Sequence, residues 1–361
     1  MKYPAFQAGA DLMGQALAGV SRRIPVYAQM HEFVAAQAGI PAERFYSDAS
    51  VMVPAMLQAQ ADAGLDVANI TYDIYNIEAE ALGQKLLLSE TGMLEIDRSA
   101  PLIRDRADLA CIRTPDFARS GRFTAVLDRY AVFHKLTGLQ PTLGFCGPFT
   151  LAANLRGIEQ LLIDIYADPD FAASLLERLT NEVLAPWIEY QKQRFPLAKS
   201  ISGADAIASP PIVNLQILRE WGLPSVRRLQ QICGRGVYVG NWVGERLLAE
   251  PQTMLDLKLE PCGRWIQGQD PDADVLGPEY YKAYATGRDV PLILGVGAGF
   301  MATSTPAQVA QRVRRYARAG ARGGRFALYL CNIGATTPPA NLRAAVETAH
   351  SIDPAELRLD G

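Results

Sequence analysis

The chain has 361 residues, of which 49% are hydrophobic and 20% charged, with a formal net charge of -3 and a pI near 5.8. This composition is typical of a folded globular protein, and its charge gives no general attraction to nucleic acid or anionic lipid. No apolar run reaches the roughly 18 to 20 residues of a membrane-spanning helix, and the N-terminus shows no secretory signal. Five scattered cysteines, an odd number, are typical of reduced thiols, so we expect a soluble cytoplasmic protein.

Short apolar runs alternate with amphipathic helical patterns along the whole chain. The runs expected to be strands are, in chain order, 24–29, 67–72, 141–145, 199–202, 236–239, 264–267, 291–295 and 326–330. Helical spacing of apolar residues is clear at 171–193 and 306–319. Strands that alternate with helices predict a parallel sheet, and eight of them favour a closed (β/α)8 TIM barrel of the α/β class over an open sheet.

The domain organisation that we expect is one barrel over residues 1–361. A short helical extension over about 1–20 precedes it, and the irregular stretch at about 84–120 forms an excursion beside the barrel mouth. No repeat, low-complexity tract or linker divides the chain.

Polar side chains gather where the expected strands end, which is where parallel barrels carry their chemistry. We expect Asp73, Asn76, Asp205, Asn241, Gln269 and Cys331 to line one cavity. Simpler interpretations stay open: Glu78 and Glu80 as partners of a helix dipole, Asp205 as a helix cap, and Asp270 as part of a turn. None of the three histidines falls at an expected strand end, which disfavours a His-based triad or a His-rich metal site.

Three segments resemble the uroporphyrinogen decarboxylase superfamily. They are 144–154 (GFCGPFTLAAN), similar to its third-strand segment; 331–341 (CNIGATTPPAN) followed by 346–350, similar to its last strand and helix; and 72–83 (YDIYNIEAEALG), similar to its second-strand acidic segment. They occur in the order and spacing of the family. The resemblance independently implies a (β/α)8 barrel.

The resemblance to the decarboxylase branch fails at the residues that carry its chemistry. Asn154 stands in place of its tyrosine, Cys331 in place of its histidine, and 29–33 (QMHEF) in place of its arginine-rich segment. A polycarboxylate substrate needs several fixed cations, which these positions do not supply.

The other branch holds corrinoid-dependent methyltransferases. Its thiol-methylating members bind zinc through a His-x-Cys pair and a later cysteine; Cys331 matches the latter, whereas 237–241 lacks the pair. Segments 75–83 and 203–205 resemble the subgroup that demethylates methyl ethers. The resemblance implies transfer of a methyl group from a small donor, such as an aromatic methyl ether, to cobalt of a corrinoid (cobalamin) on a partner protein. A homodimer is compatible with this organisation.

Site roles follow from this resemblance and the strand-end positions. The candidate catalytic acids are Asp205, Asp73 and Glu245, because a leaving oxygen departs more easily when it is protonated. The expected substrate-binding residues are Tyr72, Tyr75, Asn76, Asn241, Trp242, Gln269 and Asn332. If zinc binds, Cys331 would hold it together with Asp205, Glu245 or Asp270. The alternatives are a lyase or decarboxylase acting on a non-porphyrin substrate, and a non-catalytic accessory protein of the same fold.

Overall fold

The computed structural model describes residues 2–88, 94–234 and 236–358. Contacts divide the chain into two compact units, which we describe separately. Unit 1 comprises Met1–Tyr72, Val132–Leu139 and Arg264–Gly361, and unit 2 comprises Asp73–Ala131 and Gln140–Gly263. Among the described residues, no helix is long and apolar enough to cross a membrane.

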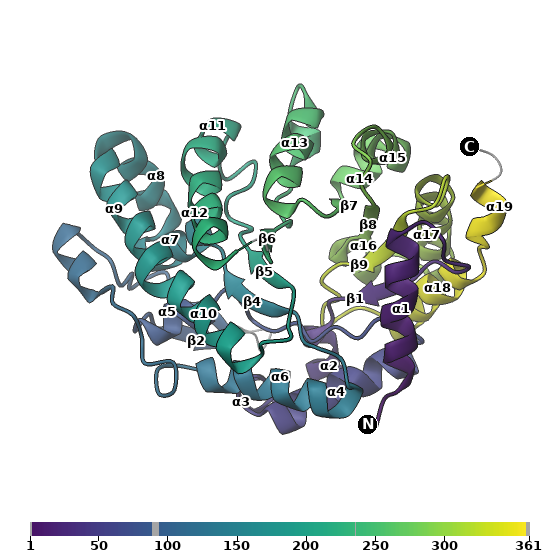
Figure 1. Cartoon of the computed structure of the whole chain (residues 1–361), viewed down its shortest axis with the longest axis horizontal. Coiled ribbons are helices and arrows are strands. Elements are labelled where there is room, and N and C mark those ends of the chain that lie inside the picture. Colours follow the sequence, from purple (N-terminus) through teal and green to yellow (C-terminus); the bar gives the residue numbers. More distant parts are fainter. Residues whose placement is uncertain (1, 89–93, 235, 359–361) are drawn as a thin grey trace. The chain divides into compact units, whose positions relative to one another are not determined.

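Unit 1 is built on a parallel sheet with strand order β1-β9-β8-β7 (Figure 1). Its strands are β1 (Val26–Ala28), β7 (Ile266–Gln269), β8 (Leu292–Val296) and β9 (Phe326–Leu330). Its helices are α1 (Ala5–Leu17), α2 (His31–Gln37), α3 (Ala42–Ser47), α4 (Ala49–Asp62), α14 (Asp272–Leu276), α15 (Pro278–Gly287), α16 (Ala298–Thr303), α17 (Pro306–Gly320), α18 (Pro339–His350) and α19 (Pro354–Arg358).

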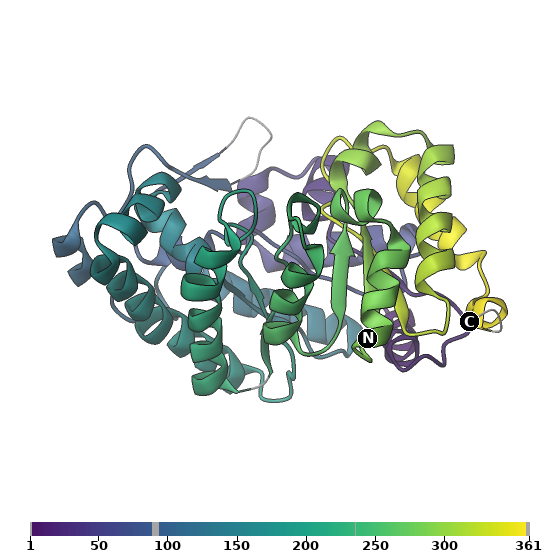
Figure 2. The same ribbon diagram turned by 90° about the horizontal axis from the view of Figure 1, so that it is seen from above.

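Helix α17 shows how local chemistry sets these boundaries. Thr305 and Gln308 form a reciprocal capping box, and Pro306 occupies the first turn, where its missing N–H is not needed. Helix α17 packs against α18, beside the sheet, and the two lie side by side in both views (Figures 1 and 2). The expected helix at 306–319 is therefore confirmed.

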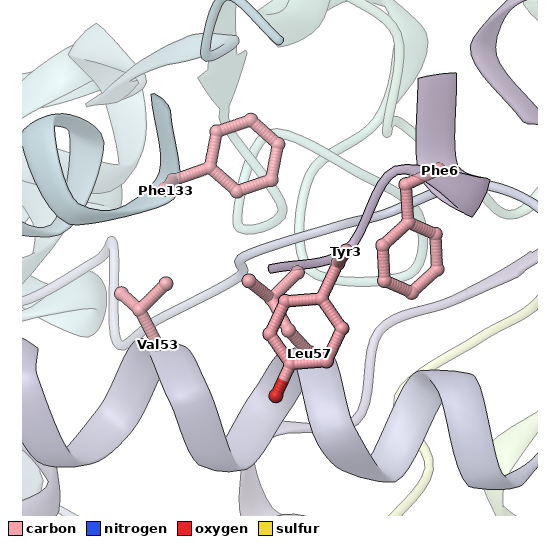
Figure 3. Close-up of a cluster of buried hydrophobic side chains, with 5 residues drawn as sticks. All are labelled: Tyr3, Phe6, Val53, Leu57 and Phe133. Atoms are coloured by element: carbon pink, nitrogen blue, oxygen red, sulfur yellow. The ribbon is translucent and has the colours of Figure 1, made fainter. Parts of the chain in front are cut away.

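A separate apolar cluster fixes the N-terminal segment within unit 1. It joins Tyr3 and Phe6 to Val53 and Leu57 of α4 and to Phe133 (Figure 3). The Tyr3 hydroxyl donates to Oε1 of Gln58 at 3.2 Å, so the ring is buried while its polar end is satisfied. The expected N-terminal helical extension corresponds to α1, which this cluster holds against the rest of the unit.

The strand expected at 67–72 is absent: Val67 lies in a bend, and residues 68–72 have no regular secondary structure. The reason is the side chain of Gln60, which replaces a neighbouring strand. Its Oε1 accepts from the Asn69 N–H at 2.8 Å, and its Nε2 donates to the Asn69 carbonyl at 2.7 Å. Asn69 in turn donates through Nδ2 to the Ala28 carbonyl at 3.2 Å, which ties the segment to the end of β1.

Unit 2 holds a second parallel sheet with the order β4-β5-β6. Its strands are β4 (Leu143–Cys146), β5 (Ile201–Ala204) and β6 (Val237–Val239), in which Cys146 is in register with Ala204, and Gly203 with Val239. Its helices are α5 (Ile77–Ala81), η1 (Arg106–Cys111), α6 (Phe123–Thr137, whose last residues belong to unit 1), α7 (Pro148–Arg156), α8 (Ile158–Ala167), α9 (Pro169–Arg178), η2 (Leu179–Leu184), α10 (Ala185–Arg194), α11 (Leu215–Ile217), η3 (Leu218–Gly222), α12 (Leu223–Cys233), η4 (Glu245–Leu247) and α13 (Pro251–Cys262).

Two details of unit 2 refine the sequence-based expectations. The helix expected at 171–193 is interrupted by a π-helical turn, η2, between α9 and α10. The excursion at about 84–120 contains an antiparallel pair, β2 (Leu86–Leu88) and β3 (Leu94–Ile96), followed by η1. Seven of the eight expected strands are present, and the prediction of a single domain stays a prediction.

Candidate active site

Asp205 follows β5 directly and is fully buried. Its Oδ1 accepts the backbone N–H of Thr150 at 2.8 Å, and its Oδ2 makes no hydrogen bond of ordinary geometry with another described residue. Burial raises the pKa of Asp205 to about 6, while contacts with Thr150 and Trp242 oppose the rise. A carboxyl group in this state can carry a proton close to neutral pH, as a general acid requires.

Neighbouring residues fix the position of Asp205. A Cβ on Gly147 would lie 2.2 Å from the Asp205 Cβ, so only glycine fits there. Oδ1 of Asn241, just past β6, accepts the Asp205 N–H at 3.0 Å, and its Nδ2 donates to the Tyr75 hydroxyl at 3.2 Å. Asn154 donates to the Tyr75 carbonyl at 2.8 Å. The structure thus brings together three of the expected site residues, Asp205, Asn241 and Tyr75.

Glu78 is a second buried acid, which sequence reasoning left out of the candidate catalytic set. It lies on α5, and its Oε1 accepts the Cys146 N–H at 3.0 Å, whereas its buried Oε2 has no partner among the described residues. Burial raises the pKa of Glu78 to about 8. Burial, together with the charges of Glu78 and Asp205, also raises the pKa of Cys146, so this thiol stays neutral. The only sign of Glu78 in the sequence was its position in the first turn of an expected helix. An interaction with the helix dipole explains an acid at that position equally well.

Asp73 lies in an ion pair, and its partner was also missed in the sequence. Arg122, immediately before α6, donates through Nη2 to Oδ2 of Asp73 and through Nε to Glu80, both at 2.6 Å. These two carboxylates raise the pKa of Arg122, against the effect of its burial. Asn76 donates to the Leu94 carbonyl at 2.8 Å and, at 3.4 Å, to Asp73. The Asp73 carboxylate is therefore engaged in an ion pair with the Arg122 guanidinium.

Glu245 lies in a second buried ion pair. Oε1 of Glu245, at the start of η4, is 2.5 Å from Nζ of Lys258 on α13, and both side chains are almost fully buried. A carboxylate held by an ammonium group in this way is a poor proton donor.

In unit 1, Gln269 and Cys331 are brought together from two strand ends. Cys331 Sγ donates to Oε1 of Gln269 at 3.4 Å, and Gln267 Nε2 donates to the same oxygen at 3.0 Å. Burial raises the pKa of the Cys331 thiol to about 12. Cys331 is therefore a neutral hydrogen-bond donor in this arrangement.

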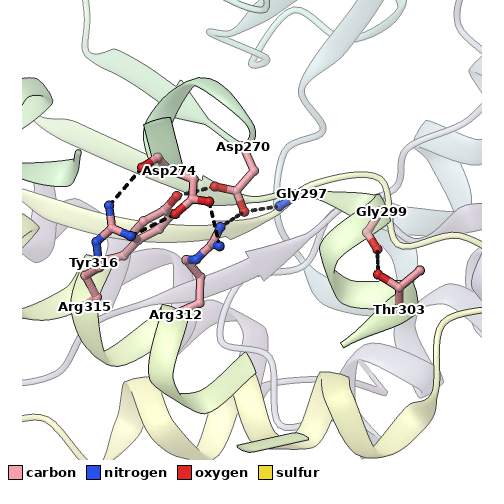
Figure 4. A network of polar contacts seen from close by, with 8 residues as sticks. All are labelled: Asp270, Asp274, Gly297, Gly299, Thr303, Arg312, Arg315 and Tyr316. Atoms are coloured by element: carbon pink, nitrogen blue, oxygen red, sulfur yellow. Dashed lines mark hydrogen bonds and ion pairs between the residues drawn. The ribbon is translucent and has the colours of Figure 1, made fainter. Parts of the chain in front are cut away.

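Asp270 is surrounded by donors (Figure 4). Its Oδ2 accepts from the Gly297 N–H at 3.1 Å and from Arg312 Nη1 at 2.8 Å, and its Oδ1 accepts from the Tyr316 hydroxyl. Arg312 also bonds Asp274 at 2.8 Å. Burial raises the pKa of Asp270 despite these donors. This network connects the end of β7 to α17, which supports a structural role.

The remaining expected residues have different environments. Tyr72 and Trp242 are buried, and the Trp242 indole nitrogen makes no hydrogen bond of ordinary geometry within the described chain. Asn332 is exposed and has a left-handed backbone with φ of 49°. His31 begins α2, beyond the end of β1, and its Nδ1 is 2.6 Å from the Tyr46 hydroxyl. Whether the residues of the two units share one cavity stays a prediction.

The donor set does not fit the zinc ion that the resemblance allows. No group of three His, Cys, Asp or Glu side chains among the described residues is arranged to hold a metal ion. Cys331 faces an amide, Asp270 is bonded to Arg312, and Glu245 is bonded to Lys258. These side chains are therefore engaged in contacts that do not make a zinc site.

Comparisons with known proteins agree with the fold described above. The chain is 25% identical over 306 residues to a methylated-thiol–coenzyme M methyltransferase from Methanosarcina mazei, an alignment that covers 83% of this chain and 76% of the relative. A solved structure of a methyltransferase from Methanosarcina mazei superimposes with a TM-score of 0.75 at 16% identity, covering 97% of this chain and 98% of the other. The model of the uroporphyrinogen decarboxylase family matches residues 10–352. The chain therefore belongs to the uroporphyrinogen decarboxylase family and has its α/β barrel fold.

Proposed function

We propose that the protein is a methyltransferase that moves a methyl group from a small donor to the cobalt of a corrinoid carried by a separate protein. The family match and the similarity to a methyltransferase that acts on a methylated thiol and coenzyme M support methyl transfer. The single observation that carries the mechanism is Asp205, a fully buried carboxyl with one oxygen left without an ordinary hydrogen bond.

The chemistry follows from the leaving group, which is the atom that the methyl group is transferred from. When methyl passes from an ether oxygen to cobalt, the C–O bond breaks, its electron pair stays on the oxygen, and the cobalt supplies the pair for the new bond. The phenolate that forms is basic, so proton donation during bond cleavage lowers the barrier, typically 10²- to 10⁴-fold. Asp205 supplies this proton and becomes a carboxylate, which the Thr150 N–H stabilises.

The nature of the acid indicates the class of donor. A thioether or thiol is best activated by a soft metal, which the described residues are not arranged to hold. An oxygen leaving group is best activated by a proton, which Asp205 can carry. We therefore favour a methyl ether, and an aromatic one, because Trp242 directly follows Asn241, which positions Asp205, and the Tyr75 hydroxyl accepts a hydrogen bond from Asn241.

The function is tested with purified protein, 2-methoxyphenol as donor and free reduced cobalamin as acceptor. We expect the cobalt(I) absorption to be replaced by that of methylcobalamin, with catechol formed in equal amount. Asp205→Asn should abolish both signals, while Glu159→Gln, an exposed carboxyl on α8, should retain them. Catechol formed without any corrinoid would show that cobalt is not the methyl acceptor and would overturn the proposed transfer, and a methylated thiol that outperforms the ether would overturn the donor class.

A further inference from the structure

One face of the unit 1 sheet carries a row of amides and aromatic rings. The opposite face packs against helices: Gly268 lies under the ring of Tyr281 on α15, and the neighbouring Leu294 and Leu328 are fully buried. Because side chains alternate along a strand, Gln267 and Gln269 point to the other face. The residues that share this face and pack there include Tyr27, Trp265, Ile293, Ala327, Tyr329 and Cys331.

Gly295 of β8 allows side chains from the two flanking strands to meet. It is in register with Gln269 on β7 and with Tyr329 on β9. A Cβ at Gly295 would lie 2.8 Å from the Cβ of Gln269 and 3.4 Å from the Tyr329 ring. Since glycine has no side chain, Cys331 reaches across β8 to Gln269.

These contacts determine which way the Gln269 amide faces. Its Oε1 accepts from both Gln267 Nε2 and Cys331 Sγ, so its NH₂ group points away from them. That NH₂ group has no hydrogen-bond partner among the described residues. Gln29 is arranged similarly, because its Oε1 accepts from the Tyr329 hydroxyl at 2.8 Å and its NH₂ group is left over. Both side chains are only partly buried, so a ligand can reach them.

We propose that Cys331 is a positioning residue, a neutral thiol whose hydrogen bond orients Gln269, and that the NH₂ groups of Gln269 and Gln29 bind an acceptor oxygen of the substrate. Two neutral donors beside the stacked rings of Tyr27 and Tyr329, whose centroids are 4.7 Å apart, suit an oxygenated aromatic ring. This inference rests on the proposed function, and it adds the residues that would bind the aromatic methyl donor. It also gives Cys331 a role that needs no metal.

The contact between Cys331 and Gln269 is consistent with this role. Cys331 Sγ lies 3.4 Å from Oε1 of Gln269, and because an amide oxygen can only accept a hydrogen bond, this contact requires the protonated thiol. A zinc thiolate would instead have no proton to donate, and Gln269 would lose one of the two donors that fix its amide.

The first test is spectroscopic and requires no turnover. The infrared S–H stretch of Cys331 is isolated as the difference between the wild type and Cys331→Ser. We expect a band at the lower frequency of a hydrogen-bonded thiol, and Gln269→Leu should move it to that of a free thiol. Cys262 provides the matched control because it is as buried as Cys331, with 6% of its surface exposed against 7% for Cys331. The S–H band of Cys262 should not respond to Gln269→Leu. The absence of a Cys331 band, or a band that Gln269→Leu leaves unmoved, overturns the proposal.

The second test measures the binding of 2-methoxyphenol by calorimetry, without corrinoid. Loss of one hydrogen bond should weaken binding about tenfold in Gln269→Leu and in Gln29→Leu. Cys331→Ala should weaken it a few-fold, and Cys331→Ser should restore most of the loss because a hydroxyl also donates. Equal affinities in all these variants, including no binding at all, overturn the subsite. If both tests give the expected results but no corrinoid accepts the methyl group, the proposed function fails and this inference stands.

Discussion

The backbone N–H of Thr150, in the first turn of α7, donates to Oδ1 of Asp205 at the end of β5, over 2.8 Å. This bond stabilises the carboxylate form, whereas complete burial favours the neutral acid and has the larger effect. The balance leaves the pKa of Asp205 at about 6. Methyl transfer should therefore require the protonated form, and kcat should fall about tenfold per pH unit above this value. Rates measured across pH 5 to 9 test this, and a flat profile would exclude Asp205 as the acid.

Thr150→Val should shift that pH profile. The threonine hydroxyl lowers the pKa of Asp205 and also accepts the Ile207 N–H at 3.1 Å. Valine has nearly the same shape but no hydroxyl, so the pKa of Asp205 should rise and the descending limb should move to higher pH. A limb that moves to lower pH, or does not move, would contradict the assignment.

Stability should also depend on pH through Glu78. Its pKa is about 8 in the folded chain and near 4.5 in a solvated one, so between these values the folded chain holds a proton that the unfolded chain has released. The free energy of unfolding therefore falls as pH rises through this window, by an amount on the order of a few kcal/mol. Urea unfolding should show a shallower decline in Glu78→Gln, while the exposed Glu159→Gln should follow the wild type. Parallel curves for all three proteins would show that Glu78 is not the cause.

Replacing Arg122 should lower the free energy of unfolding more than replacing its partner Glu80. Arg122→Met leaves the Asp73 carboxylate, with a side chain 2% exposed, as an unpaired buried charge, so we expect a loss of about 3 to 5 kcal/mol. Glu80 is 28% exposed at its side chain, and Glu80→Gln should cost about 1 kcal/mol or less. Adding Asp73→Asn to Arg122→Met should recover part of the loss in urea unfolding, and a purely additive double variant would contradict the pairing.

Glu245 should prove structural and not catalytic. Glu245→Gln leaves the Lys258 ammonium buried beside a neutral amide, so the unfolding midpoint should drop by several degrees. The fraction that stays folded at low temperature should transfer methyl groups at close to the normal rate. A large loss of kcat in fully folded Glu245→Gln protein would return Glu245 to the set of candidate acids.

Much of the fold could be read from local patterns, because buried parallel strands are short apolar runs and their ends are adjacent in space. Asp205 and Asn241 follow neighbouring strands, β5 and β6, and the structure joins them by a hydrogen bond. The superfamily resemblance added the barrel class, which the family match confirms.

The residues that sequence reasoning misplaced all depend on pairing between distant positions. Arg122 lies 49 residues from Asp73, and Glu78 lies 68 residues from Cys146, so no local pattern relates them. Likewise, Asp270 and Glu245 have the sequence context of site acids, but whether a carboxylate faces a ligand or a buried cation is decided by tertiary packing.

The Gln60 side chain that replaces a strand next to Asn69 has a consequence for amide hydrogen exchange. A ladder protects a row of amides together, whereas one carboxamide protects only the single N–H that it accepts. The Asn69 amide should therefore exchange slowly, and Gln60→Leu should remove its protection. The backbone that leads into Tyr72 and Asp73 is thus held at Asn69 by side chains and not by a ladder, so a small change in local free energy is enough to release it.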